Sequence, residues 1–155
     1  MADKFKVLQP WLTLLSRLIL GVVLLVAGGL KIGNLPKSAM AVRAYELLPI
    51  SIANFFGYAL PWFEVGLGAL LILGVATRLS AFFAGSLMIV FILAIASAWA
   101  RGLSIDCGCF GGGGQVAPGE TKYLQEILRD VGLTLLAVYL YWRPHTKWAL
   151  EPGSR

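Results

Sequence analysis

The chain has 155 residues, of which 58% are hydrophobic and 14% are charged. Soluble domains average about 45–50% apolar and about 25% charged residues, so this composition excludes an ordinary soluble domain. It predicts a single integral membrane domain over residues 1–155. The net charge of +5 does not indicate nucleic-acid binding, because Lys and Arg commonly flank membrane spans and no basic stripe is interleaved with aromatic residues.

The first predicted element is an apolar span over residues 11–30, which follows a polar tail, Met1–Pro10. A helix of that length reaches about 30 Å, which matches the hydrocarbon core of a bilayer. The segment is longer than the core of a usual signal peptide, and Arg17 interrupts it. We therefore expect a retained span rather than a cleaved signal.

A short amphipathic helix is predicted between the first and second spans. The sequence Asn-Leu-Pro at residues 34–36 is typical of a helix start, because proline is tolerated in the first turn. Apolar residues continue as far as Leu47, and Pro49 predicts the end of the helix. We expect this helix to lie at the membrane surface.

Three further spans are predicted over residues 55–76, 79–100 and 122–142. The span over residues 55–76 contains one charged residue, Glu64. The span over residues 79–100 follows a predicted tight turn at Thr77-Arg78 and contains no charged residue. Glycines in the first two spans favour close packing of helices. The predicted fold is all-α, a four-transmembrane-helix bundle with the short amphipathic helix between spans one and two.

Both cysteines, Cys107 and Cys109, lie in the predicted loop 101–121, within the sequence DCGCFGGGG. Bridged cysteines need Cα atoms about 4.4–6.8 Å apart, and the glycines permit the sharp bend this requires. A bridge in so small a ring would be strained, which is typical of labile, redox-active disulfides. Two idle thiols on a glycine loop remain an alternative. A metal site is not expected, because two cysteines and one histidine fall short of four ligands.

Four ionisable residues, Lys31, Glu64, Arg129 and Asp130, fall in the membrane half that adjoins the cysteine loop. Such groups usually face a bundle interior or a cavity. We expect a polar pocket formed from three helices, which would favour a reactive thiolate nearby or bind the polar head of a quinone. The alternative is a set of ion pairs that only fix the helices.

The topology follows from the number of spans and from the cysteine chemistry. Four spans place both termini on one side, and the positive charges are nearly balanced between the two sides. Disulfide exchange persists in oxidising compartments. We therefore expect a multi-pass protein of the cell membrane, with the cysteine loop extracytoplasmic and both termini cytoplasmic.

Three segments resemble the MauE/DoxX-type family of redox-associated membrane proteins: RLILGVVLLVAGGLKI, ALPWFEVGLGALLILGVATRLSA, and IDCGCFG followed by ILRD. The similarity extends over about residues 14–140, and IDCGCFG is its most specific part. It implies a four-helix membrane bundle, with Cys107 and Cys109 as the exchanging pair. For the methylamine-utilisation members it implies maturation of the disulfide-rich small subunit of methylamine dehydrogenase beside a thioredoxin-like partner.

The leading hypothesis is a membrane thiol–disulfide oxidoreductase that exchanges electrons with a thioredoxin-like protein, a disulfide-containing client or a lipid quinone. A second hypothesis is a non-enzymatic assembly factor that holds a client at the membrane. A third is a small-solute carrier that uses the charged pocket, although inverted repeats, which are common in carriers, are absent from the sequence.

Overall fold

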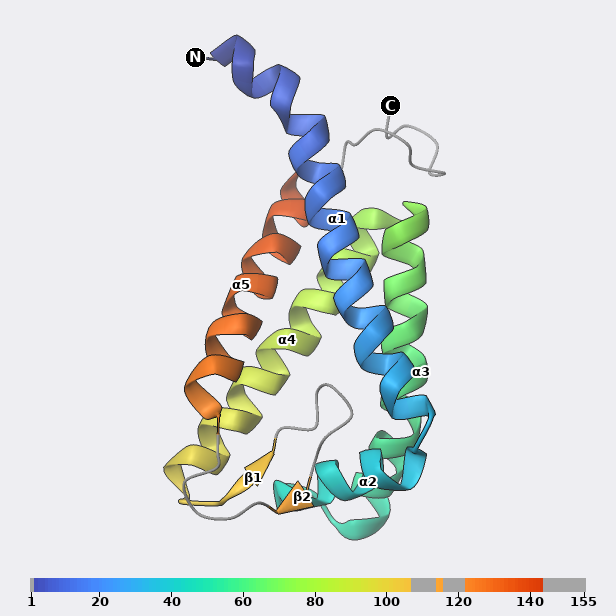
Figure 1. Ribbon diagram of the computed structural model, residues 1–155, viewed down its shortest axis with the longest axis vertical. Helices are drawn as coiled ribbons and strands as arrows, with labels where there is room; N and C mark the ends of the chain where they lie inside the picture. The colour runs from blue at the N-terminus through green and yellow to red at the C-terminus, as the bar shows by residue number, and fades with distance from the viewer. Residues whose placement is uncertain (1, 107–113, 116–121, 144–155) are drawn as a thin grey trace.

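The computed structural model describes residues 2–106, 114–115 and 122–143, and over these the chain forms five helices (Figure 1). The helices are α1 (Ala2–Ile32), α2 (Leu35–Ala44), α3 (Ile50–Leu73), α4 (Thr77–Ala100) and α5 (Tyr123–Trp142). Two short strands, β1 (Ile105–Asp106) and β2 (Gly114–Gln115), pair antiparallel between α4 and α5. The prediction of an all-α fold is confirmed, apart from this minimal strand pair.

The four long helices lie side by side, and α2 lies with the strand pair at one end of them (Figure 1). Helix α1 packs mainly on α3, and α4 packs mainly on α5. A single apolar core joins all four helices, because each contributes Leu, Ala or Met side chains at helical spacing. Its buried members are Leu20, Leu24, Leu67, Leu71, Ala81, Ala84, Met88, Leu133, Ala137 and Leu140.

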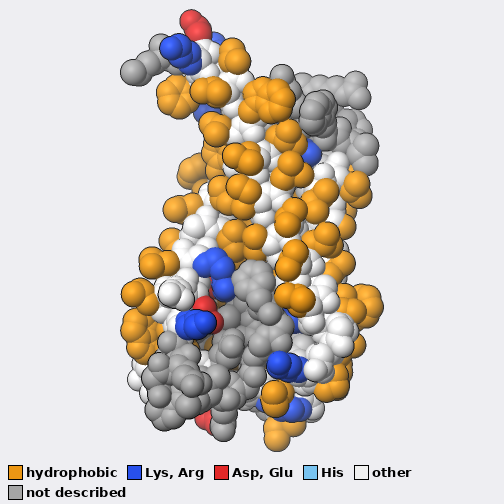
Figure 2. Space-filling model, viewed as in Figure 1, with side chains coloured by type: hydrophobic (Ala, Val, Ile, Leu, Met, Phe, Trp, Pro, Cys, Tyr) orange, Lys and Arg blue, Asp and Glu red, His pale blue; other side chains and the backbone are white. Residues whose placement is uncertain are grey.

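Three helices, α1, α3 and α4, are long and apolar enough to cross a membrane within the described part of the chain. Large apolar side chains also cover the outside of the bundle, as Figure 2 shows. Exposed apolar surface of this extent is expected where lipid, rather than water, surrounds the helices. Helix α5 is not among the three, because its first turns carry Glu126, Arg129 and Asp130.

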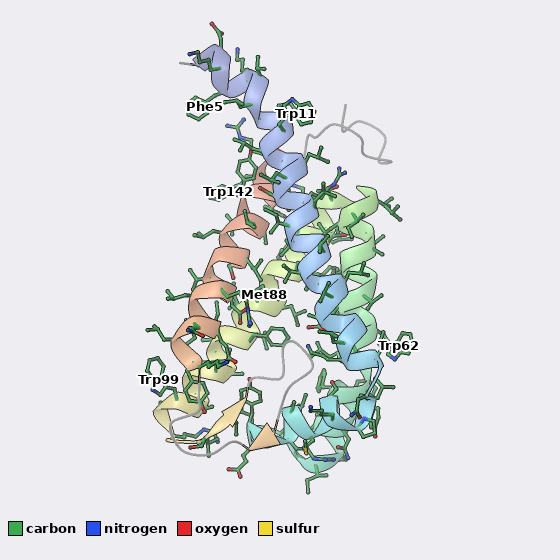
Figure 3. The ribbon with its side chains drawn as sticks, viewed as in Figure 1. Phe5, Trp11, Trp62, Met88, Trp99 and Trp142 are labelled. Carbon is green, nitrogen blue, oxygen red and sulfur yellow. The ribbon has the colours of Figure 1, made fainter. Side chains whose placement is uncertain are left out.

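The predicted polar tail over Met1–Pro10 is wrong, because α1 begins at Ala2 and contains Pro10. Proline lacks an N–H group, so within α1 it removes the hydrogen bond to the carbonyl of Lys6. The preceding residues are mostly good helix formers, which allows the helix to continue. This first part of α1 extends beyond the rest of the bundle, where Phe5 is exposed (Figures 1 and 3).

The reversal between α3 and α4 differs from the predicted turn at Thr77-Arg78, because Thr77 is already the first residue of α4. Helix α3 ends at Leu73, and Gly74 follows in the left-handed conformation with φ of 73°. Glycine adopts this conformation without a Cβ penalty, and its N–H group donates to the carbonyl of Leu70 at 2.9 Å. Ala76, directly before α4, is left-handed too, with φ of 47°, so the chain turns over residues 74–76 rather than at Thr77-Arg78.

The short helix predicted between the first two spans is present as α2. Its start agrees with the prediction, since the side chain of Asn34 accepts a hydrogen bond from the N–H of Lys37 at 3.3 Å. Its end does not, because α2 stops at Ala44 rather than near Pro49. Glu46 then adopts a positive φ of 54°, which redirects the chain toward α3.

A proline inside α3 helps to hold α2 in place. Pro61 has no N–H group, so the carbonyl of Gly57 lacks its usual helical donor. The hydroxyl of Ser38 on α2 donates to that carbonyl at 2.7 Å. A Cβ atom on Gly57 would lie only 2.3 Å from the Cα of Ala39, so glycine is required for this contact. Helix α2 is thus fixed against α3 at the end of the bundle where α1 finishes (Figure 1).

Candidate functional site

A buried ion pair joins α1 to α3 near this end of the bundle. The ammonium nitrogen of Lys31 lies 2.9 Å from both Oε1 and Oε2 of Glu64. The Lys31 side chain is 5% exposed and that of Glu64 is 1% exposed. The same ammonium lies 5.5 Å from the ring centroid of Phe91 on α4, a cation–π distance. Both charges are therefore held inside the bundle by three helices.

Close contact between α1 and α3 places this pair. A Cβ atom on Gly28 would lie 2.6 Å from the carbonyl oxygen of Pro61, and one on Gly68 would lie 2.7 Å from that of Gly21. Small residues that let helix backbones approach are typical of membrane helix interfaces. Because Gly28 and Pro61 each stand three residues before a member of the pair, the close backbones bring Lys31 and Glu64 into contact.

A second ion pair lies on α5. Arg129 donates from Nε and Nη2 to Oδ1 of Asp130, at 3.1 and 3.0 Å. Neighbouring residues on a helix point in different directions, and here Asp130 is 1% exposed while the Arg129 side chain is 30% exposed. The other carboxylate oxygen of Asp130, Oδ2, is buried with no hydrogen-bond donor among the described residues.

The two pairs meet at a small cavity of about 10 Å³. Glu64, Arg129 and Asp130 line it, together with apolar residues of α1, α4 and α5. The structure thus brings together the four residues singled out in the sequence, from α1, α3 and α5. A volume of this size has room for about one water molecule and none for the ring of a quinone.

The chemistry of this cluster follows from its charges. Two carboxylates and two cations balance, so the cluster brings no net charge into the apolar bundle. Within the described residues, no group of three His, Cys, Asp or Glu side chains is arranged to hold a metal ion. The Lys31–Glu64 pair links α1 to α3, whereas Arg129 and Asp130 pair within α5, and the small cavity between the two pairs can hold a small polar molecule such as water.

The cysteines of the predicted redox pair, Cys107 and Cys109, lie outside the described residues. The backbone on either side of them is described: Asp106 pairs with Gly114, so the chain returns on itself across the segment that contains both cysteines. Tyr123, at the start of α5, anchors this hairpin, since its hydroxyl bonds to the carbonyl of Leu103 and accepts from the N–H of Ile105.

Two aromatic residues at this end of the bundle were not singled out in the sequence. Phe91 touches the Lys31 ammonium and lines the small cavity, and Tyr123 ties the hairpin to α5. Nothing in the sequence distinguishes Phe91 from the other phenylalanines of the apolar helices. Tyr123 could have been noticed as an aromatic hydroxyl at the end of a span, where one side is apolar and the other polar.

Comparison with known proteins gives a consistent family result. The family profile described as methylamine utilisation protein MauE matches residues 9–143. The chain is 38% identical over 104 residues to a methylamine utilization protein MauE from Methylorubrum extorquens, covering 65% of this chain and 53% of that protein. It is 33% identical over 102 residues to the MauE of Methylophilus methylotrophus, covering 65% and 54%. The chain spans about half the length of these relatives, and no solved structure matches it.

Proposed function

This chain belongs to the MauE family of methylamine utilisation proteins, and from that membership we propose that it is a membrane thiol–disulfide redox protein that acts through Cys107 and Cys109. The observation that carries the proposal is the paired backbone at Asp106 and Gly114. It closes a hairpin around a segment whose only side chains with redox chemistry are the two cysteines.

The proposed reaction is exchange through a mixed disulfide. The thiolate of one cysteine attacks a disulfide of the partner, forms a mixed disulfide and releases one partner thiolate. The second cysteine then attacks the mixed disulfide, which leaves a Cys107–Cys109 disulfide and a fully reduced partner. The reverse sequence oxidises a partner dithiol. A thioredoxin-like protein or a disulfide-containing client is the proposed partner. When a partner dithiol is oxidised, Cys107 and Cys109 are left reduced, and their disulfide re-forms as two electrons and two protons pass to a lipid quinone, the proposed electron acceptor.

The proposed topology places all four long helices across the membrane. Helix α5 has 20 residues, enough to cross a hydrocarbon core of about 30 Å. Its second half contributes Leu133, Ala137 and Leu140 to the core shared with the three apolar helices. In its charged first half Arg129 and Asp130 balance each other, and Glu126 lies in the first turn, at the end of the helix. With four spans both termini are cytoplasmic and the cysteine hairpin is extracytoplasmic, in an oxidising compartment.

The charged cluster is proposed to support this chemistry by fixing helices at the hairpin end of the bundle. Lys31 and Glu64 join α1 to α3, and Arg129 and Asp130 of α5 line the same small cavity as Glu64. Helix α5 also holds the hairpin through Tyr123. The small volume beside Glu64 and Asp130 favours this positioning role over direct binding of a quinone ring.

Single replacements of the two cysteines by serine test the proposal. The full chain is expressed in membranes, and adducts are separated on non-reducing gels and identified by mass spectrometry. We expect one of Cys107→Ser and Cys109→Ser to trap a covalent adduct that reductant releases. In that variant no second cysteine is present to attack and resolve the mixed disulfide with the partner. The double variant is the matched control, since it leaves no cysteine in the chain.

Two outcomes would contradict the proposal. If neither single variant forms an adduct and the double variant supports methylamine growth fully, the chain acts as a non-enzymatic assembly factor. If thiol labelling in intact cells shows both cysteines facing the cytoplasm and always reduced, the extracytoplasmic exchange is excluded.

A further inference from the structure

A large apolar groove lies between α3 and α4, on a different side of α3 from the charged cluster. Its volume is about 670 Å³, which is within the range of about 300–1,000 Å³ found for ligand sites. The lining is almost wholly apolar and comes from α3, α4, the last turn of α2 and the segment that links α2 to α3. Five aromatic rings contribute to it: those of Tyr45, Phe55, Phe56, Phe63 and Phe91.

The groove is shaped for a flexible chain rather than for another helix. Helices that associate in membranes do so through small residues that allow close backbone approach, as Gly28 and Gly68 do between α1 and α3. The groove instead presents large side chains, among them Leu60 and Phe63. Because α3 and α4 are both candidate membrane spans, hydrocarbon rather than water has access to the groove.

Two arginines border the groove at the end nearest α2. Arg43 donates from Nη1 to the side chain of Asn54 at 2.7 Å, and Asn54 directly precedes the groove residue Phe55. Arg101 donates from Nη2 to the carbonyl of the groove residue Tyr45. Each guanidinium is therefore held beside a groove residue, Arg43 beside Phe55 and Arg101 beside Tyr45.

Arg101 also shares a face of α4 with the groove. Val90 and Ala94 line the groove, and Arg101 follows Ala94 by seven residues, which is two helical turns. The residue is the C-cap of α4, so it stands where this span leaves the hydrocarbon. Its position matches that of a lipid headgroup whose chain lies beside Val90 and Ala94.

Both arginines are available to an anion. Each is exposed, and the ion pairs between described residues are Lys31–Glu64 and Arg129–Asp130, so neither arginine has a carboxylate partner there. A guanidinium carries five N–H donors. The contact with Asn54 uses one nitrogen of Arg43. Arg101 uses two nitrogens, because its Nε also donates to Ser97. Donors remain for the oxygens of a phosphate.

We propose that this groove is a binding site for an anionic glycerophospholipid, with a hydrocarbon chain in the α3–α4 groove and the phosphate held by Arg43 and Arg101. The charge of the entrance complements a phosphate, and the apolar lining complements the chain. Glu46 is the one carboxylate near this entrance whose side chain is described; it is exposed and forms no ion pair with either arginine. The proposal does not depend on the cysteines, so its test is independent of the test of the redox function.

The test measures lipid binding to the delipidated full chain by native mass spectrometry. Phosphatidylglycerol and phosphatidylcholine with identical acyl chains are the two probes. We expect phosphatidylglycerol to bind more tightly. The double variant Arg43→Gln/Arg101→Gln should lose about 25-fold in affinity for phosphatidylglycerol, about fivefold for each charge near the membrane surface. Its affinity for phosphatidylcholine should fall less, because the choline of that lipid already balances the charge of its phosphate.

A second pair of variants tests the groove itself. Ala94→Phe fills the groove and should weaken binding of both lipids, whereas Ala96→Phe on the exposed face of the same helix should weaken neither. Lys6→Gln removes an exposed charge from the far end of the bundle and is the control for the arginines. If Ala94→Phe does not fold, Ala94→Leu replaces it.

Three results would overturn the proposal. Equal affinity for the two lipids in the unaltered chain would exclude recognition of a net negative headgroup. Unchanged binding in a folded Ala94→Phe variant would place the lipid elsewhere. Conversion of a dimer to a monomer by Ala94→Phe, without loss of lipid, would show that a second copy of the chain occupies the groove.

Discussion

Helix α3 packs against α1 on one side and borders α4 on another, and the two interfaces are built in opposite ways. Against α1, glycines bring the backbones together and a buried ion pair crosses the contact. Toward α4, which follows directly in the chain, large side chains leave a groove of about 670 Å³. The comparison teaches that residue size, rather than order along the chain, decides which helices meet closely in this bundle.

The largest expected effect comes from the interface between α1 and α3, where removing one charge breaks the Lys31–Glu64 ion pair. Glu64→Gln keeps the volume of the side chain and leaves the Lys31 ammonium buried without a countercharge. Breaking a buried pair in this way costs about 3–5 kcal/mol. Unfolding of the purified chain in detergent should show a loss of this size.

Two further variants sharpen this first prediction. Glu46→Gln removes an exposed carboxylate and should change the free energy of unfolding by less than about 0.5 kcal/mol. Lys31→Met combined with Glu64→Leu should recover most of the lost stability, because an apolar pair of similar volume replaces both charges. A loss below about 1 kcal/mol in Glu64→Gln would contradict the importance given to the pair.

The next effect tests the glycine contact itself. Gly28→Val places a Cβ atom 2.6 Å from the carbonyl oxygen of Pro61, so backbone must move. Overpacking of this kind costs about 1–3 kcal/mol. Gly29→Val is the matched control, because the neighbouring position has nothing within 4 Å of an added Cβ atom. Equal unfolding free energies for the two variants would show that α1 and α3 do not need this close approach.

The sequence predicts the helices of this bundle well because apolar length and few charges are local properties. It also predicts which ionisable residues share one end, since their depth follows from their position along each span. It does not predict the groove. Both α3 and α4 are apolar on most of their faces, so nothing in the pattern of Phe63 or Ala94 separates a packed face from an open one.

Two element boundaries differ from those predicted, the start of α1 and the turn between α3 and α4. The N-terminal residues look like a tail because they carry Lys4 and Lys6, yet α1 continues through Pro10, although an interior proline costs about 3 kcal/mol. The turn before α4 is predicted at Thr77-Arg78, but the left-handed residues are Gly74 and Ala76. Backbone conformation, rather than polarity, sets the position of that turn.

The smallest effect is expected on the face of α3 that lines the apolar groove. Leu60 lines the groove, and lipid chains are as apolar as leucine, so lipid can fill the space that Leu60→Ala creates. We expect a loss of less than about 1 kcal/mol in lipid bicelles. Leu71→Ala on the same helix is the matched control, because Leu71 is fully buried in the shared core. Its truncation leaves a cavity that lipid cannot reach and should cost about 2–5 kcal/mol. If both truncations cost the same, the groove is packed as tightly as the core, and the contrast between the two sides of α3 is removed.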